Sequence, residues 1–146
     1  MVFESIEDLC SYLNNVEIPK MLKDKVAPVI KNIEQDVTQE VVYDVYNPAV
    51  YERRYENGGL KDKNNMIERV TNDGNSILLE IENVTTVSED SYDSSQGTYL
   101  DEIIEYGLPA YDTEYNQPRP FTQKTQERID ESGEIEKIIQ QSLDRL

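Results

Sequence analysis

Residues 66–84 read MIERVTNDGNSILLEIENV, and the fold class follows from this stretch. Two runs, residues 66–71 and 76–84, are typical of β-strands, and the Asp-Gly pair between them indicates a two-residue hairpin turn. The second run alternates apolar residues with a mostly polar set, namely Ile77, Leu79 and Ile81 with Leu78, Glu80 and Glu82. A lone hairpin is marginal in water, so it must pack on other elements. Helical patterns lie on both sides of it, which predicts an α+β fold: N-terminal and C-terminal helices packed on a small antiparallel sheet.

Residues 4–14 carry the first helical pattern. Its apolar residues lie at i, i+3, i+4 and i+7, namely Ile6, Leu9, Cys10 and Leu13. Ser5 precedes them as a candidate N-cap, so we expect a short amphipathic helix. Because Cys10 shares its apolar side, we expect Cys10 in the core. One cysteine cannot form an internal disulfide.

A longer helical pattern begins at Pro19 and ends near residues 43–46. Its apolar residues recur every three or four positions: Leu22, Val26, Val29, Ile30, Ile33, Val37 and Val41. Pro28 interrupts the pattern, and a proline inside a helix removes a hydrogen bond and clashes with the preceding turn. We expect a kink there, or two helices that meet near Ala27.

The second half of the chain predicts a loop and more helix. Residues 85–98 are polar, acidic and aperiodic, which indicates a mobile loop. Residues 99–106 are a short helix candidate that Gly107 ends, and a further helix runs from residue 120 or 121 to the end, weakened at Ser132-Gly133. With 146 residues and no compositional break, the whole chain, 1–146, is expected to form a single domain.

The chain is strongly acidic, with a net charge of −16 from 14 Lys+Arg and 30 Asp+Glu. Residues 64–146 hold most of that charge. Tight binding to nucleic-acid phosphates is therefore not expected. An acidic surface can keep a protein soluble, imitate DNA, or line a passage through which DNA slides.

Neither a membrane span nor a signal peptide is indicated. No apolar run approaches the ~18 residues that a membrane span requires. The first residues, MVFE, have neither the basic nor the apolar region of a secretory signal. We expect a protein made in the cytoplasm.

The amino-acid composition argues against a catalytic site or a metal-binding site. The chain has no histidine and one cysteine, so common general bases, Ser-His-Asp arrangements and structural zinc sites are excluded. Asp101 and Glu105 could hold a divalent cation on one helical face, but acids are too abundant for that pair to be informative. We expect neither enzymatic activity nor a cofactor.

Residues 46–60, YNPAVYERRYENGGL, place two arginines among three tyrosines. Arg53 and Arg54 could bind a phosphate, but in so acidic a chain we favour pairing with carboxylates or stacking on Tyr51 and Tyr55. The glycine pair beside them lacks a nucleotide-binding spacing, which favours a turn with positive φ. We interpret this segment as a rigid structural corner.

The order of motifs over residues 30–146 resembles a family of small virion proteins of tailed bacteriophages. These are the neck or tail-component proteins, also described as tail-completion or tail-terminator proteins, between the head connector and the tail tube. The resemblance depends on YDVYNPAVYERRYENGGL at residues 43–60, on the later LDEIIEYG, and on PRPF before a C-terminal helix. The long acidic loop 85–98 and the segment LPAYDTEYNQ depart from the family pattern.

The resemblance implies a structural α+β subunit that assembles into a ring around the DNA channel, with six copies favoured and twelve possible. Its implied partners are further copies of itself, a head-side connector or stopper protein, and the tail-tube protein, and its implied location is the head–tail junction of the virion. The positions that match the family are Tyr46, Pro48, Tyr51, Arg53, Arg54, Gly58, Gly59, Leu60, Leu100, Glu102, Arg119, Pro120 and Phe121. Together with Tyr55, they form the candidate structural and interface motif.

An acidic lumen would repel the phosphates of passing DNA. The candidate lumen-facing acids are Glu80, Glu82, Glu89, Asp90 and Asp93. Two functions of other classes stay open. A DNA mimic that inhibits a DNA-binding partner would need carboxylates along one face, and a carboxylate-dependent metal enzyme would need a pocket that binds a divalent ion.

Overall fold

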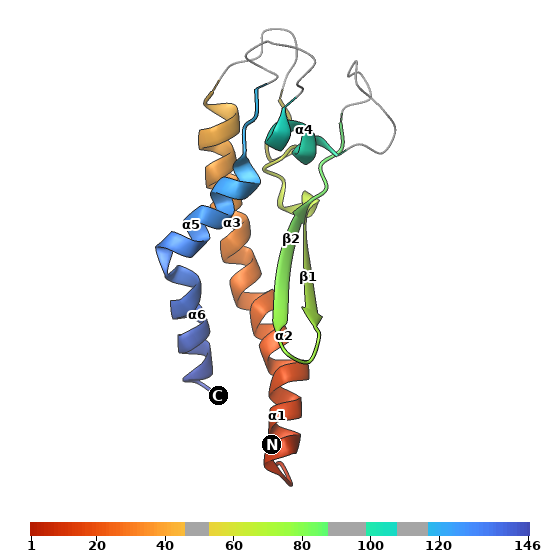
Figure 1. The fold of residues 1–146 in the computed structure, drawn as a ribbon, viewed down its shortest axis with the longest axis vertical. Helices are drawn as coiled ribbons and strands as arrows, with labels where there is room; N and C mark the ends of the chain where they lie inside the picture. Colours follow the sequence, from red (N-terminus) through yellow and green to blue (C-terminus); the bar gives the residue numbers. More distant parts are fainter. Residues whose placement is uncertain (46–52, 88–98, 108–116) are drawn as a thin grey trace.

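The computed structural model describes residues 1–45, 53–87, 99–107 and 117–146. A long helical run forms its first part (Figure 1). This run comprises α1 (Ile6–Tyr12), η1 (Leu13–Glu17), α2 (Ile18–Met21), η2 (Leu22–Val26), α3 (Ala27–Thr38) and η3 (Gln39–Tyr43), where η1, η2 and η3 are π-helical turns. At its start the Ser5 side chain accepts a hydrogen bond from the Asp8 N–H at 3.1 Å, as expected of an N-cap.

Each proline of the long helix follows a π-turn. In η1 the Ile18 N–H donates to the Leu13 carbonyl, and Pro19 comes next. In η2 the Ala27 N–H donates to the Leu22 carbonyl, and Pro28 comes next. A proline lacks an N–H and its ring crowds the preceding turn, and the wider i to i+5 turn accommodates both effects. The expected kink, or meeting of two helices, near Ala27 corresponds to the passage from η2 into α3, through which the helix continues, and the expected separate helix over residues 4–14 is likewise continuous with the rest.

The antiparallel hairpin of β1 (Met66–Asn72) and β2 (Ile77–Asn83) lies alongside the long helix (Figure 1). Asn72 pairs with Ile77, so the connection has four residues and the predicted two-residue turn is wrong. The Asp73 carboxylate accepts hydrogen bonds from the backbone N–H groups of Asn75 (2.9 Å) and Ser76 (2.8 Å), and Gly74 has φ +88°. This Asp-capped turn stabilises the longer loop.

One face of the hairpin packs toward the long helix. The alternation predicted for β2 is confirmed, because Ile77, Leu79 and Ile81 are partly buried while Leu78, Glu80 and Glu82 are exposed. On β1, Met66 is fully buried and Glu68 forms an ion pair of 2.5 Å with Lys31 of α3. The hairpin is therefore held to the helix by both apolar and charged contacts.

After the short η4 turn (Lys63–Asn65) and the hairpin come α4 (Leu100–Tyr106), α5 (Phe121–Ser132) and α6 (Glu134–Leu143). Of these helices, α5 and α6 lie on the other side of the long helix, and α4 lies near the exit of the hairpin (Figure 1). Gly133 has φ +64° and separates α5 from α6, which confirms the predicted weakness at this point. Lys25 Nζ lies 3.3 Å from Ser142 Oγ, where α6 meets η2.

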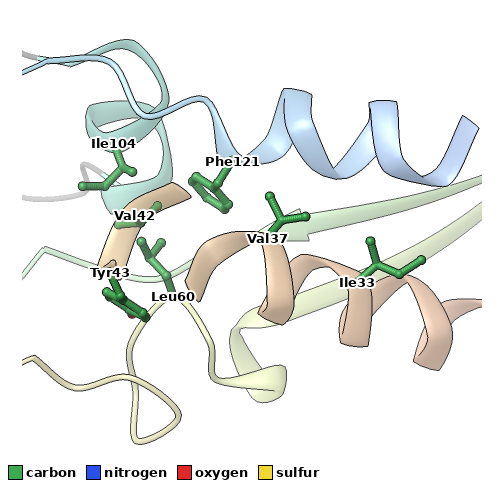
Figure 2. Packing of buried hydrophobic residues seen from close by; sticks show 7 residues of the cluster. All are labelled: Ile33, Val37, Val42, Tyr43, Leu60, Ile104 and Phe121. Carbon is green, nitrogen blue, oxygen red and sulfur yellow. The ribbon is translucent and has the colours of Figure 1, made fainter. Parts of the chain in front are cut away.

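A hydrophobic cluster joins α3, η3, α4, α5 and the residues before β1 (Figure 2). Its buried members are Ile33, Val37, Val42, Tyr43, Leu60, Ile104 and Phe121. Phe121 is fully buried at the start of α5 and contributes the largest apolar side chain. The α+β class predicted from the sequence is confirmed.

The N-terminal end of the long helix lies outside this cluster. No residue of α1, η1 or α2 is buried, and Cys10 is exposed, so the prediction of Cys10 in the core is wrong. In Figure 1 this end projects beyond the hairpin turn and beyond the end of α6. Its apolar residues have no cover within the described chain comparable to that of α3.

Two further findings concern the segments between elements. Thr85, placed by the sequence in a mobile loop, is fully buried, and its carbonyl accepts a 2.7 Å hydrogen bond from the Leu100 N–H. Thr86 of the same loop is bridged to Tyr99, and residues 88–98 lie outside the described residues. Over the residues that the structure does describe, no helix combines the length and the apolarity needed to cross a membrane.

Candidate subunit interface

The corner predicted around Arg53 and Arg54 is built on Tyr43, the last residue of the long helix. The Arg53 guanidinium lies 5.0 Å from the centre of the Tyr43 ring, and its Nη1 donates to the Tyr43 carbonyl at 2.7 Å. The Tyr55 ring packs edge-on against Tyr43, with ring centres 4.6 Å apart. Burial raises the pKa of the Tyr43 hydroxyl. Arg53 thus stacks on Tyr43. Of its two predicted stacking partners, Tyr55 packs against the same Tyr43 ring and Tyr51 lies outside the described residues.

Arg54 connects the same corner to the segment after β2. Its Nη2 donates to the Thr86 carbonyl at 2.6 Å, so the predicted pairing of Arg54 with a carboxylate is not what the described chain shows. The two adjacent arginines therefore bind two different segments, the end of the long helix and the exit of the hairpin. A guanidinium carries several donors in a fixed plane, which suits it to such bridging.

The glycine pair allows the chain to turn back into the core. Gly58 has φ +86°, as predicted for this turn, and the Asp62 carboxylate accepts a 2.8 Å hydrogen bond from its N–H. A Cβ on Gly59 would lie 2.5 Å from the Tyr55 carbonyl oxygen, closer than real contacts allow. Leu60 follows directly and is buried in the cluster.

A buried polar network that the sequence did not reveal lies behind this turn. Asn83 Nδ2 donates to Glu34 Oε1 at 2.8 Å and to the Leu60 carbonyl at 2.9 Å. Thr85 Oγ1 donates to Asn83 Oδ1 at 2.6 Å. Burial raises the pKa of Glu34 to about 7, an effect that the Asn83 hydrogen bond opposes and the nearby Asp101 carboxylate reinforces. Glu34 lies between Ile33 and Val37 in the apolar pattern of α3. This position in the sequence could have predicted that Glu34 is buried.

The second group of predicted residues joins α4 to α5. The Arg119 N–H donates to the Ile104 carbonyl at 2.8 Å, and the Arg119 side chain is buried. Phe121 is in the core, Leu100 packs against it, and Pro120 is partly buried. Glu102 is exposed on α4. Apart from Glu102, these positions contribute to packing inside the subunit.

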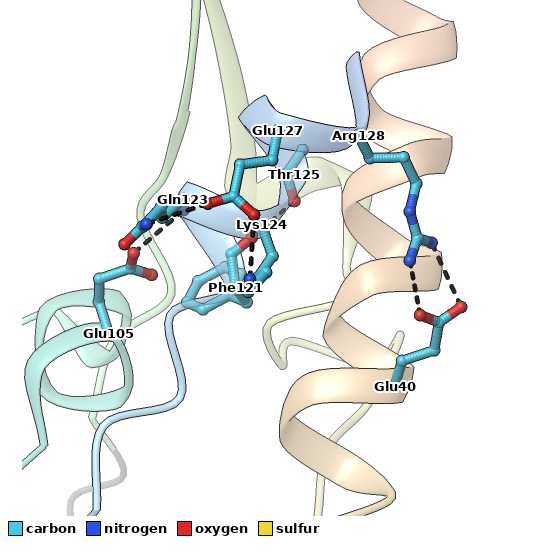
Figure 3. A network of polar contacts seen from close by, with 8 residues as sticks. All are labelled: Glu40, Glu105, Phe121, Gln123, Lys124, Thr125, Glu127 and Arg128. Atoms are coloured by element: carbon cyan, nitrogen blue, oxygen red, sulfur yellow. Dashed lines mark hydrogen bonds and ion pairs between the residues drawn. The ribbon is translucent and has the colours of Figure 1, made fainter. Parts of the chain in front are cut away.

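Glu105, which the sequence offered as half of a cation site with Asp101, has another role. Its two carboxylate oxygens accept hydrogen bonds from the backbone N–H groups of Thr122 (2.8 Å) and Gln123 (3.0 Å), at the start of α5. Figure 3 shows the bond to Gln123. Pro120 offers no side-chain cap there, so the first amides of α5 require an acceptor from elsewhere. Among the described residues no group of three or more His, Cys, Asp or Glu side chains is placed to hold a metal ion.

An ion pair on the surface also joins α5 to the long helix. Arg128 of α5 donates to Glu40 of η3 through its two terminal nitrogens, Nη1 at 3.2 Å and Nη2 at 2.6 Å (Figure 3). This pair lowers the pKa of Glu40. Paired planar groups of this kind hold geometry as well as charge.

The candidate lumen-facing acids fall into two groups. Glu80 and Glu82 are exposed on the outer face of the hairpin, where Glu82 lies 3.7 Å from Arg69. Glu89, Asp90 and Asp93 lie outside the described residues, as do Tyr46, Pro48 and Tyr51 of the corner.

What remains for contact with another molecule is a set of exposed apolar side chains. The most N-terminal are Met1, Val2, Ile6, Leu9 and Val16, followed by Val45, Tyr55, Ile67, Leu78, Tyr99, Tyr106, Leu143 and Leu146. On the N-terminal helix, Ile6 is 76% exposed, Val16 46% and Leu9 37%. A polar hollow of about 490 Å³ separates this helix from the hairpin turn and is lined by Ser11, Asn14, Asn15, Asn72, Gly74, Asn75, Ser76 and Ile77. The polar residues of the hollow and the apolar residues Ile6, Leu9 and Val16 lie on different sides of the helix, and the apolar side is the candidate interface.

A family model described as YomN matches residues 5–145, almost the whole chain. The family is of phage origin. Neither a curated protein nor a solved structure matches the chain significantly.

Proposed function

The chain belongs to the YomN family, and from this premise we propose that it is a structural virion protein of a tailed phage. In this proposal, copies of the subunit form a ring at the head–tail junction, as a neck or tail-completion component, and DNA passes through the ring. Six copies are favoured and twelve are possible. The neighbours are the head-side connector or stopper protein and the tail-tube protein.

The observation that carries the proposal is the uncovered apolar side of the N-terminal helix. Ile6 and Val16 are 76% and 46% exposed, although the same helix is well covered from Val26 onward. Contiguous apolar surface on a monomer usually marks a site of association. A head-to-tail contact that closes on itself produces a ring, and such neighbours bury surface that a small core leaves open.

The corner supports the proposal in a second way. Arg53, Arg54 and the turn at Gly59 tie the end of the long helix to the exit of the hairpin. A ring closes only if every subunit presents its two contact surfaces at the same angle. A corner held by aromatic stacking and charge-assisted hydrogen bonds would keep that angle constant.

The acids of the hairpin would face the DNA channel. Glu80 and Glu82 are exposed on the face that points away from the long helix, which makes this face available to a lumen. Like charge would keep phosphates from adhering during DNA passage. A cryo-EM map of the assembled junction with these two residues on the outside of the ring would contradict this part of the proposal.

A phage that lacks the protein provides the functional test. If the subunit completes the neck or tail, deletion of its gene should leave DNA-filled heads and separate tails in electron micrographs, and a plasmid copy should restore joined particles. Normal particles without the protein would contradict the proposal. In that case, capture of a DNA-binding protein by the purified chain would support the alternative of an acidic DNA mimic.

A further inference from the structure

We propose that a pocket at the exit of the hairpin binds the guanidinium group of an arginine side chain from a partner protein. The pocket has a volume of about 380 Å³ and is lined by residues of α3, β1, β2, α4 and α5. The inference goes beyond the proposed ring and does not depend on it, because all of these residues belong to one subunit. We call the site the acidic pocket, and its acids are Glu34, Glu80, Glu82 and Asp101.

Two carboxylates of the acidic pocket, Glu34 and Asp101, each have an oxygen without a hydrogen-bond donor. Glu34 is 5% exposed, and Asn83 donates to its Oε1, while its Oε2 accepts no hydrogen bond from the described residues. Oδ1 of Asp101 is buried and likewise has no donor in the described part of the chain. A buried carboxylate oxygen without a donor is unfavourable. These two inner carboxylates are therefore suited to a ligand that supplies N–H groups.

The acidic pocket lacks countercharge. Among the described residues that line it, Arg69 is the only cation. Arg69 lies 3.7 Å from Glu82, and its side chain is 62% exposed, so it neutralises the outer part of the pocket at most. Lys31 of α3 is ion-paired with Glu68 of β1. A cation from outside would compensate the two inner carboxylates, which burial otherwise penalises.

The spacing of the acids favours an extended cation. In the described part of the chain no three acids are grouped closely enough to hold one metal ion. A guanidinium is planar and has several outward N–H donors, so it can reach carboxylates that a single ion cannot bridge. Its weakly hydrated faces also suit Ile67 and Ile81, which line the same pocket. An ammonium group, which is a strongly hydrated point charge, fits less well.

The surface around the acidic pocket indicates a protein as the source of the guanidinium. Ile67 and Leu78 are exposed on the outer face of the hairpin, the face that also carries Glu80 and Glu82. Arginine is enriched at protein interfaces, where it often contributes a large share of the binding energy beside apolar contacts. A free alkylguanidinium would fill the pocket and leave Ile67 and Leu78 uncovered.

Titration of the intact protein with short peptides provides the test. The probe is acetyl-Leu-Arg-Leu-amide, and methyl NMR of the isoleucines reports binding because Ile67 and Ile81 line the pocket. We expect saturable shifts of these two methyl signals, with a dissociation constant of about 1 mM or lower. The same peptide with citrulline, which has nearly the shape of arginine without its charge, should bind at least about tenfold more weakly, and the lysine peptide at least about threefold.

Ethylguanidinium separates the two sources of the group. It should bind at least about threefold more weakly than the arginine peptide, because it does not cover the apolar side chains around the pocket. Equal affinity of ethylguanidinium and the peptide would contradict the assignment to a protein side chain. Equal affinity of the arginine and citrulline peptides, or no shift of either methyl signal at about 20 mM arginine peptide, would overturn the inference.

Two variants remove a charge of the pocket and retain the fold. Burial raises the pKa of both Glu34 and Asp101, so Glu34→Gln and Asp101→Asn replace a carboxylate that the folded chain disfavours with a neutral group of similar shape. Each should raise the dissociation constant of the arginine peptide by about fivefold or more, without lowering the unfolding free energy at pH 8. Glu131→Gln, on the exposed surface of α5 and outside the pocket, is the matched control and should change the constant by less than about twofold. Equal weakening by the control would contradict the inference.

Arg69→Gln tests whether the chain fills its own pocket. The inference predicts that wild type binds the arginine peptide and that Arg69→Gln binds it at least as tightly, because a like charge beside the site is removed. Binding by the variant alone would show that Arg69 occupies the pocket in wild type, and this result would overturn the inference.

Discussion

At the residue scale, Glu34 is a carboxyl group buried in the interior of the protein. It lies 5% exposed on α3, next to apolar residues, and its carboxylate accepts a hydrogen bond from the Asn83 side chain. Burial disfavours the charged carboxylate, which is why its pKa rises to about 7. In the unfolded chain the same carboxyl would titrate near 4.5.

The raised pKa predicts a pH-dependent stability. Below pH 4.5 Glu34 is neutral in both states, so its stabilising effect as a neutral group is fully present. As the pH rises from about 4.5 to about 7, the unfolded chain releases the proton while the folded chain retains it, and roughly 3 kcal/mol of unfolding free energy is lost. Glu34→Gln retains an acceptor for Asn83 and should therefore be more stable than wild type at pH 8 by up to about that amount, with little difference at pH 4.5.

Urea denaturation of both proteins at several pH values measures this difference. Glu40→Gln is the control on the same helix, because Arg128 lowers the pKa of Glu40 and the sign reverses: its ion pair stabilises wild type above pH 4.5 and is lost as the pH falls. A Glu34→Gln difference that stays constant between pH 4.5 and 8 would contradict the interpretation.

The corner arginine gives a second prediction at this scale. Arg53→Ala removes both the stacking on Tyr43 and the hydrogen bond to its carbonyl, so the unfolding free energy should fall by about 1–3 kcal/mol. Arg69→Ala on the exposed hairpin face should change it by less than about 0.5 kcal/mol. Chemical denaturation compares the two, and equal losses would show that the corner contributes no special stability.

At the scale of elements, the helices depend on partners that are distant in sequence. The amides that begin α5 are satisfied by Glu105 of α4, and the two prolines of the long helix are accommodated by π-turns. α4 is short and carries few buried residues, so the capping contact is a large part of what attaches it to α5.

Removing this cap should destabilise the pair of helices. Glu105→Ala should lower the unfolding free energy by about 0.5–2 kcal/mol, the usual cost of losing a helix N-cap. Glu131→Ala, an exposed acid of the same α5, should be near neutral. Hydrogen exchange at the Thr122 and Gln123 amides reports the effect locally, and unchanged protection in Glu105→Ala would argue against the capping role.

The sequence predicted these elements to different degrees, for physical reasons. The alternation over Ile77, Leu79 and Ile81 identified the hairpin, because a strand with one covered face repeats every two residues. The loop length was missed, since Asp73 caps its own turn and makes four residues as favourable as two. The Glu105 cap was also missed, because an acid that contacts a distant helix looks like any other acid in a chain of net charge −16.

At the scale of the whole molecule, the same limit explains the error at Cys10. A periodic apolar side shows that a helix has something to pack against, but not which molecule supplies the cover. Ile6, Leu9 and Cys10 fit the pattern as well as Ile33 and Val37 do, yet only the latter two are covered by this subunit. The uncovered part is the physical basis of the proposal that the chain functions as an assembly of copies.

The first measurement is the native mass of the purified protein by light scattering after gel filtration, alone and with tail-tube protein. The proposed ring predicts a discrete species of six or twelve copies of the 16.9 kDa chain, either alone or when the partner is present. Deletion of residues 1–17 should reduce the number of copies in the assembly, because these residues carry the uncovered apolar side chains. A monomer that persists at all concentrations, and that binds neither tail-tube nor connector protein, would contradict the assembly of copies at the head–tail junction.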